Sequence, residues 1–178
     1  LEQLLAVTIG MADTMMVASC GEVAVSGVSL VDSINILLIN TFSALATGGA
    51  VVTAQYLGKG DRASAGMAAK QLFYVILLVS GGIMALCLLF RIPLLNAIYG
   101  HTDPAVMDNA YVYFFWSAVS YPFLAMYNAS AALLRSMGDT KTSLTTSLVM
   151  NVLNVAGNAL LIYVCRLGVA GAAIATLL

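Results

Sequence analysis

The chain has 178 residues, of which 61% are hydrophobic and 8% are charged, and its mean hydropathy is +0.98. An ordinary soluble domain has about 25% charged residues, so this chain has too few polar side chains to cover the surface of a water-soluble globule. The composition therefore excludes a soluble enzyme, a nucleic-acid-binding protein and a disordered tail. The net charge of −1 gives no reason to expect a polyanionic partner. We predict a protein that lies in the lipid bilayer.

Apolar stretches between the charged residues define the predicted membrane segments. A spanning helix needs about 20 mostly apolar residues, and continuously apolar runs favour helices over a β-barrel. Five stretches meet this requirement, at residues 4–20, 33–57, 71–90, 110–134 and 142–165, and a sixth begins near residue 167. We predict an all-α, polytopic membrane protein with five transmembrane helices and the start of a sixth. Because the apolar runs reach both ends of the chain, we expect a fragment of a longer protein.

The distribution of basic residues predicts the orientation in the membrane. Five of the seven basic residues fall in the loops after the second and fourth spans or at the helix start that follows, namely Lys59, Arg62, Lys70, Arg135 and Lys141. Basic residues are enriched on the cytoplasmic side, so these loops and the N-terminus should be cytoplasmic. We expect a multi-pass protein of the plasma membrane, which in a bacterium is the inner membrane.

Asp13 is the acid that the sequence places deepest in a predicted span. At 1.5 Å per residue it lies about 16 Å along the helix from Glu2. A charged residue at the centre of a membrane helix costs about 2.5–3.5 kcal/mol on insertion scales, so such an acid usually faces a polar cavity or a bound cation. We predict that Asp13 binds a proton or a cation. The alternative is an acid that neighbouring hydroxyl groups, such as those of Thr8 and Thr14, satisfy.

Asparagines of the fifth predicted span form a second set of candidate site residues. Asn151, Asn154 and Asn158 are separated by three and four residues, so they share one helix face. Amide oxygens are good ligands for hard cations, but amides also bridge helices. The pattern therefore leaves an ion or substrate site and interhelical hydrogen bonding as alternatives. Asn128 and Thr176, in the fourth and sixth spans, are candidates for the same cavity.

The remaining features are weaker. Pro122, in the middle of the fourth span, should bend that helix and is a candidate hinge. Asp32, near the outer end of the second span, is expected to lie at the solvated interface. Among the nucleophiles and bases of the chain, no Ser/His/Asp or Cys/His arrangement appears, so we predict no enzyme activity. We expect no cofactor, and no metal other than a cation such as Na⁺ at the polar residues inside the membrane.

Several motifs resemble those of the multidrug and toxic compound extrusion (MATE) family of cation-coupled exporters. They cover nearly the whole chain, at residues 11–17 (MADTMMV), 48–61 (GGAVVTAQYLGKGD), 132–141 (ALLRSMGDTK), 151–162 and 167–176 (LGVAGAAIAT). The family has twelve helices in two six-helix lobes. The resemblance implies that residues 1–178 are the N-terminal transmembrane lobe, incomplete at both ends, without the C-terminal lobe.

The resemblance also implies a function and a site. It implies a secondary antiporter that uses H⁺ or Na⁺ to export organic, often cationic, compounds between its two lobes. The cation-coupling site of this lobe would fall on Asp13, Asn128, Asn154, Asn158 and Thr176. Because Asn158 stands where some members have Asp, Asp13 would be the only acid inside the membrane in this lobe. That departure weakens a high-affinity Na⁺ site and leaves proton coupling open.

Two other functions stay open at this point. A flippase for a lipid-linked or polysaccharide precursor, within the wider superfamily, would need a cationic cleft for diphosphate. The basic residues of this chain lie in loops or at helix ends, which argues against it. A membrane assembly subunit that does not transport would tolerate Asp13→Asn without effect.

Overall fold

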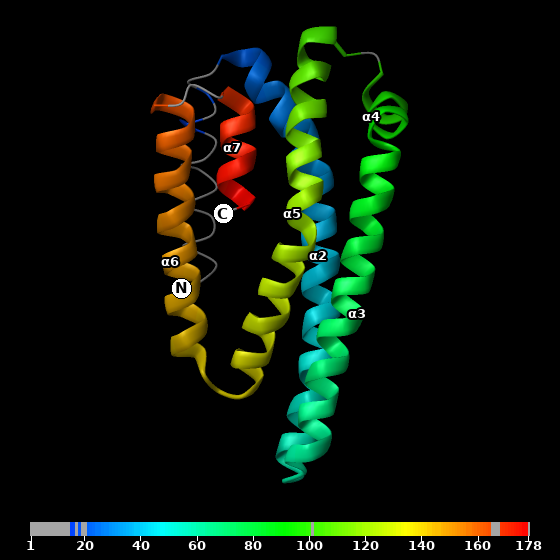
Figure 1. The fold of residues 1–178 in the computed structure, drawn as a ribbon, viewed down its shortest axis with the longest axis vertical. Coiled ribbons are helices and arrows are strands. Elements are labelled where there is room, and N and C mark those ends of the chain that lie inside the picture. Colours follow the sequence, from blue (N-terminus) through cyan, green and yellow to red (C-terminus); the bar gives the residue numbers. More distant parts are fainter. Residues whose placement is uncertain (1–14, 17, 19–20, 101, 165–167, 178) are drawn as a thin grey trace.

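The computed structural model describes residues 15–16, 18, 21–100, 102–164 and 168–177, and these residues are helical apart from short connections. Figure 1 shows long helices that run side by side. In chain order the elements are α2 (Glu22–Gly58), α3 (Arg62–Leu89), α4 (Arg91–Tyr99), α5 (Pro104–Ser136), α6 (Thr140–Ala159), the π-helical turn η1 (Leu160–Val164) and α7 (Gly168–Leu177). The protein is an all-helical membrane lobe, as the sequence predicts.

Aspartates start three of the long helices, α3, α5 and α6. The side chains of Asp61, Asp103 and Asp139 each accept a hydrogen bond of 3.0 Å from a backbone N–H of the first turn. These bonds satisfy donors that the helix leaves unpaired. Pro104 follows Asp103 at the first position of α5, where its missing N–H costs nothing.

The core lies where α5 packs against α2 and α3. The buried residues of α5 recur every three or four positions along one stripe, at Ala110, Phe114, Ala118, Tyr121, Ala125 and Ala129. The small alanine side chains let the helix backbones approach closely. Helices α2 and α5 approach closely at Gly27 of α2, where an added Cβ would lie 2.8 Å from the carbonyl oxygen of Val106. Phe42 of α2 and Ile76 of α3 fill the remaining space and are fully buried.

A second, smaller core joins the two ends of the described chain. Ala24 and Val28 of α2 pack with Ile162 of η1 and Ala172 of α7, and Tyr113 of α5 lies against this cluster. The red α7 therefore sits between α6 and α5, as Figure 1 shows. The interior of the lobe is enclosed by α2 and α5 on one side and by α6, η1 and α7 on the other.

Most of the predicted spans correspond to helices in the structure. Of the described helices, α2, α3 and the segment Thr140–Ile162 are long and apolar enough to cross a membrane. The fourth predicted span corresponds to α5, whose 33 residues include the polar and aromatic side chains described below. The first predicted span, residues 4–20, falls almost wholly outside the described residues. Two elements were not predicted, the short helix α4 and the π-helical turn η1.

Helix α5 bends along its length. Pro122 lies inside it, and Figure 1 shows the second half of α5 leaning away from α2 towards α6. A proline inside a helix removes one backbone donor and crowds the preceding turn, which bends the helix. The bend predicted at Pro122 is therefore present.

Candidate functional site

The asparagines of α6 form one polar stripe, and its deepest member is buried. The Nδ2 of Asn158 donates a hydrogen bond of 3.2 Å to the Oδ1 of Asn154, and Asn158 is only 1% exposed. Asn151 and Asn154 are partly exposed, and the Nδ2 of Asn151 lies 3.5 Å from the Oγ of Ser147. The predicted shared face is therefore confirmed. We call Asn154 and Asn158 the amide pair.

The amide pair lies where α6 approaches α7 and changes its winding. An added Cβ on Gly157 would lie 3.3 Å from the Cβ of Ala175, so the two helices are close beside Asn158. The π-helical turn begins two residues after Asn158, at Leu160. Such turns interrupt the regular hydrogen-bond ladder and are often found at functional sites. The structure thus places a buried amide beside locally irregular backbone in the lobe interior.

The other predicted site residues are not all brought to the amide pair. Asn128 is half-buried on α5, and its Nδ2 donates to the carbonyl oxygen of Leu124 in its own helix at 3.0 Å. The backbone of Thr176 belongs to α7, but its side chain lies outside the description. Asp13 lies outside the described residues altogether. Of the five predicted residues, the structure joins Asn154 and Asn158 directly.

Sequence reasoning missed a polar network between α2 and α5. The carboxylate Oδ1 of Asp32 accepts hydrogen bonds from the hydroxyl of Tyr113 at 3.2 Å and from the Nδ2 of Asn35 at 3.4 Å. The same Nδ2 lies 3.4 Å from the Oγ of Ser117, and the hydroxyl of Tyr121 donates to the Oδ1 of Asn35 at 2.8 Å. Asn35, Ser117 and Tyr121 are buried. We call these five residues the Asp32 network.

The side chain of Asp32, which the sequence predicts at the solvated interface, contacts α5. Helix α2 begins at Glu22, so Asp32 lies ten residues, or about 15 Å, along it. Its side chain is only partly exposed and points to α5 rather than to water. The available signal was the three-residue spacing of Asp32 and Asn35, together with the four-residue spacings of Tyr113, Ser117 and Tyr121. The sequence could not show that these two polar faces meet.

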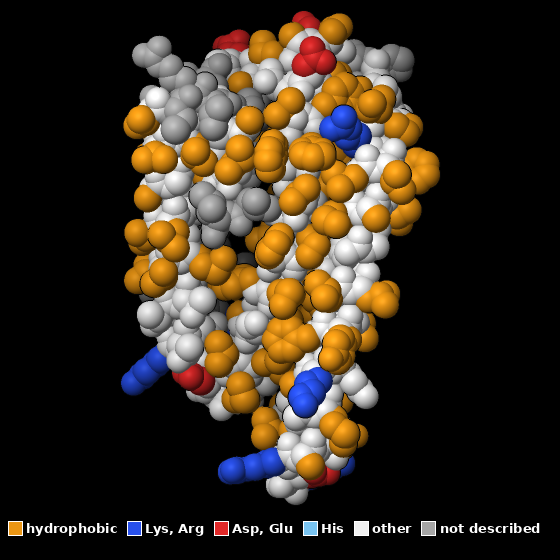
Figure 2. Space-filling view, viewed as in Figure 1, with side chains coloured by type: hydrophobic (Ala, Val, Ile, Leu, Met, Phe, Trp, Pro, Cys, Tyr) orange, Lys and Arg blue, Asp and Glu red, His pale blue; other side chains and the backbone are white. Residues whose placement is uncertain are grey.

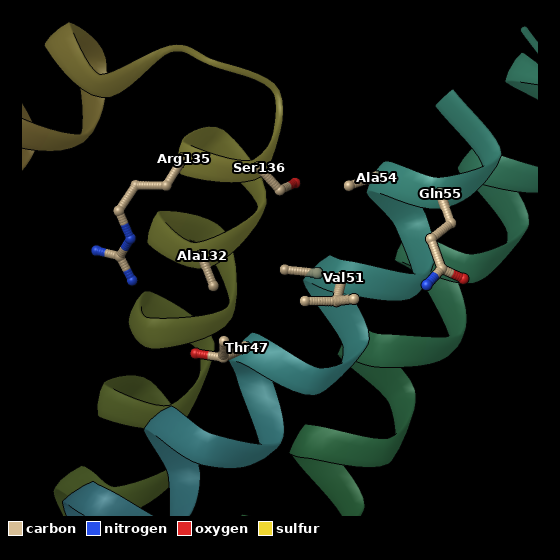
Figure 3. Close-up of a pocket in the computed structure, with 8 residues that line it drawn as sticks. Thr47, Val51, Ala54, Gln55, Ala132, Arg135 and Ser136 are labelled. Atoms are coloured by element: carbon tan, nitrogen blue, oxygen red, sulfur yellow. The ribbon is translucent and has the colours of Figure 1, made fainter. Parts of the chain in front are cut away.

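A pocket opens at the other end of the same helix pair. Its volume is about 520 Å³, and α2 and α5 line it with Thr47, Ala50, Val51, Ala54, Gln55, Ala132, Arg135 and Ser136. In Figure 3, Ala132 and Ser136 of α5 face α2 across the pocket, and Arg135 and Gln55 stand at its two sides. The pocket lies below the bend of α5 and brings together two of the sequence motifs, residues 48–61 and 132–141. We call it the basic-end pocket because Lys and Arg side chains gather towards this end in Figure 2.

Comparison with known proteins adds the family. The family model described as MatE matches residues 1–160, which is most of the chain. The chain belongs to the MATE family of membrane transporters. The uncharacterized transporter YisQ of Bacillus subtilis is 33% identical over 172 residues, which are 94% of this chain and 37% of YisQ. Protein DETOXIFICATION 43 of Arabidopsis thaliana is 33% identical over 99 residues, 55% of this chain and 19% of that protein.

Solved structures show the same fold. An outward-facing multidrug resistance MATE family transporter of the MOP superfamily superposes with a TM-score of 0.90 at 21% identity, over 99% of this chain and 39% of that one. An inward-facing structure of such a transporter gives a TM-score of 0.89 at 22% identity, over 95% of this chain and 38% of that one. The chain therefore spans less than two fifths of the relatives and structures it matches.

Proposed function

We propose that this chain is the N-terminal lobe of a cation-coupled secondary antiporter that exports organic, often cationic, compounds. The coupling ion, H⁺ or Na⁺, would be held by Asp13 together with Asn128, Asn154, Asn158 and Thr176. The observation that supports this proposal best is the buried amide pair in the lobe interior. A second lobe of the same protein would complete the substrate path, and the lipid bilayer of the plasma membrane would surround both.

The chemistry of the amide pair suits a coupling site. An amide oxygen attracts a small hard cation or a protonated carboxyl group, and neither ligand needs a fixed charge on the amide. Buried asparagines are costly unless they have polar partners, so their presence inside a membrane lobe needs such partners. Loading Asp13 would change the charge of the site and favour one packing of the lobe over another. Substrate and ion then compete through the conformation that each prefers.

The flippase alternative gains little from the described residues. Holding a diphosphate needs several cations directed into one cleft. The basic-end pocket has Arg135 as the one basic residue of its described lining, and the remainder is mostly small or apolar. We therefore retain export of organic cations as the proposed function.

Transport by the complete protein tests the proposal. Ethidium uptake into everted membrane vesicles that contain it would be measured after a pH jump or a Na⁺ pulse. The wild type would be compared with the variants Asp13→Asn, Asn158→Ala and Asn151→Ala. We expect gradient-driven uptake that Asp13→Asn abolishes and Asn158→Ala lowers by about tenfold, within the usual range of coupling energies. Asn151→Ala is the matched control, because this residue shares the helix face but is less buried.

Three outcomes would contradict the proposal. Ethidium uptake that depends on neither the proton nor the Na⁺ gradient would exclude an antiport mechanism. Ethidium uptake unchanged in Asp13→Asn would show that the coupling ion does not bind at Asp13 in this lobe. Equal effects of Asn151→Ala and Asn158→Ala would show that the amide pair has no special role.

A further inference from the structure

Asp32 is a carboxylate in the lobe interior whose contacts within the described chain are with neutral groups. Its two hydrogen-bond donors are the hydroxyl of Tyr113 and the amide of Asn35. A partly buried carboxylate with neutral partners in a membrane lobe is costly unless an ion or a proton compensates its charge. The proposed coupling residues of the lobe do not include it.

The titratable and charged groups of the neighbouring helices have contacts of their own. Helix α5 provides the titratable Tyr113 and Tyr121. Helix α4 provides Tyr99, whose hydroxyl donates to the carbonyl of Leu30 at 3.2 Å, and Arg91, whose guanidinium lies 5.6 Å from the centre of the Phe115 ring. Cys87 of α3 lies in the same buried cluster as Tyr121. The apolar Ala172 of α7 and Ile162 of η1 lie in the cluster against which Tyr113 packs. No ion pair joins Asp32 to a basic side chain among the described residues, so its charge is open to neutralisation by a proton.

Three hydrogen bonds of the Asp32 network point towards the carboxylate, while the Nδ2 of Asn35 also donates to the Oγ of Ser117. Tyr121 donates to Asn35, Asn35 donates to Asp32, and Tyr113 donates to Asp32. An ionised carboxylate can only accept, so this direction suits the charged form. When a proton from water binds a carboxylate oxygen, a new O–H bond forms and Asp32 becomes a donor. The proton can bind Oδ2, whereas the bonds from Asn35 and Tyr113 both end on Oδ1, which then becomes a neutral carbonyl acceptor. A neutral acceptor makes weaker hydrogen bonds than a carboxylate, so Asn35, whose Oδ1 accepts from Tyr121 at 2.8 Å, is held less firmly.

Tyr121 lies directly before the bend of α5. Pro122 has no N–H to donate to the carbonyl of Ala118, so the helix is held less firmly at this turn. The network ties the half of α5 before Pro122 to α2, and the half after it contributes Ala132, Arg135 and Ser136 to the basic-end pocket. A change at Asp32 therefore reaches the residue that borders the bend through two hydrogen bonds.

We propose that Asp32 is a second proton-binding position of this lobe, and that Asn35 and Tyr121 transmit its protonation to the bend at Pro122. The inference rests on the proposed function, since it assigns Asp32 to the same ion-driven cycle. Asn35 and Tyr121 are positioning residues in this scheme. Asp32 binds the proton.

A spectroscopic experiment tests proton binding without any need for transport. The purified complete protein is taken from alkaline to acidic buffer, and the infrared difference spectrum is recorded. We expect a carboxylic acid C=O band that Asp32→Asn removes and that Asp108→Asn and Asp13→Asn retain. Asp108 is the matched control, because it is an exposed acid in the first turns of α5. A spectrum unchanged by Asp32→Asn would overturn the proposal.

Transport tests the coupling role of the same proton. In everted vesicles with an imposed pH gradient, we expect Asp32→Asn to lower ethidium uptake by about tenfold and Asp108→Asn to leave it within about twofold. Asparagine can keep the bonds from Tyr113 and Asn35, so the variant should elute as a single species like the wild type. Tyr121→Phe should shift the pH dependence of uptake while it retains the infrared band of Asp32. Loss of the band with uptake unchanged would also overturn the coupling role.

The two proposals fail in different ways. If the wild type shows no gradient-driven uptake of ethidium, the proposed function fails for this substrate, and the infrared spectrum still decides whether Asp32 binds a proton. If uptake occurs and depends on Asp13 alone, the proposed function stands and the role of Asp32 is overturned.

Discussion

Asp139 shows how a single polar contact fixes a helix start. Its Oδ1 accepts the backbone N–H of Thr142 at 3.0 Å, and its Oδ2 accepts the hydroxyl of the same residue at 2.7 Å. The hydrogen bonds from the side chain and then the backbone of Thr142 lower the pKa of this exposed carboxyl below its ordinary value of 3.8. A lowered native pKa means that the stabilisation is fully present above the unfolded value. It is lost as the pH falls through the native one.

Comparing aspartate, asparagine and alanine at position 139 should separate the stabilisation by the N-cap hydrogen bonds from the stabilisation by the carboxylate charge. Asp139→Ala should lower the melting temperature of the complete protein at neutral pH, because it removes the cap. Asp139→Asn should retain most of the cap, since asparagine is a good N-cap residue. The difference between the wild type and Asp139→Asn should shrink in acid. Melting curves in detergent over a pH series measure this, and a constant difference at all pH values would contradict the pKa assignment.

Gly27 is a second residue whose environment makes a sharp prediction. An added methyl group would meet the backbone of α5, with the Val106 oxygen at 2.8 Å and the Ala110 nitrogen at 3.1 Å. Backbone cannot move aside without separating α2 from α5. We expect Gly27→Ala to destabilise the protein by about 1–3 kcal/mol, the usual cost of overpacking.

Gly48 provides the matched control, since it lies on the same helix with no atom within 4 Å of an added Cβ. Gly48→Ala should leave the melting temperature unchanged or raise it slightly, because alanine favours the helix. If both variants melt alike, the close approach of α2 and α5 is not what Gly27 provides.

Individual residues also show what the sequence could and could not predict. The spacing of Asn154 and Asn158 predicts a common face, because the helix repeat alone fixes it. The contacts of Asp32 need more, since its partner Tyr113 lies 81 residues away. The partners of Asn35 on α5, Ser117 and Tyr121, lie 82 and 86 residues from it. The helical periodicity of one segment does not show which face of another helix it packs against. The sequence therefore predicts a position for Asp32 near the solvated interface and does not reveal its contact with α5.

At the level of single elements, the bend of α5 sets the shape of the basic-end pocket. Pro122 separates the half that packs on α2 from the half that leads away from it (Figure 1). The sequence predicts this bend, because proline acts through its own ring. It does not predict η1, since a π-helical turn depends on how α6 meets α7 at Gly157 and Gly171.

We expect Pro122→Ala to straighten α5 and narrow the basic-end pocket. In a variant of the complete protein without its own cysteines, Ala54→Cys places a thiol in the pocket lining. A maleimide should label this thiol more slowly when Pro122 is replaced. Ala63→Cys, at an exposed position in the first turn of α3, is the control and should react at the same rate in both backgrounds. Equal rates at Ala54→Cys would show that the proline does not hold the pocket open.

At the scale of the whole lobe, charge and apolarity together predict how it sits in the membrane. Hydrophobic side chains cover the visible face along its length, and Lys and Arg side chains gather at the end where α2 meets α3 and α5 meets α6 (Figure 2). The composition predicts the helical membrane fold, because 61% hydrophobic residues leave few alternatives. Composition does not predict which helices pack against one another, since the alanine stripe of α5 could pack against several helices.

The orientation is open to a direct measurement. The positive-inside rule predicts that the α2–α3 connection is cytoplasmic and the α4–α5 connection is outside. A single cysteine at Ala63, beside Arg62, should react with a membrane-impermeant maleimide in everted vesicles and not in intact cells. A single cysteine at Ala105, an exposed position after Asp103, should show the opposite pattern. Both positions lie in first helical turns, so the chemistry of the two thiols is comparable. The reverse pattern would place Arg135 and the basic-end pocket outside the cell, and the acidic end with Asp103 and Asp108 would then face the cytoplasm.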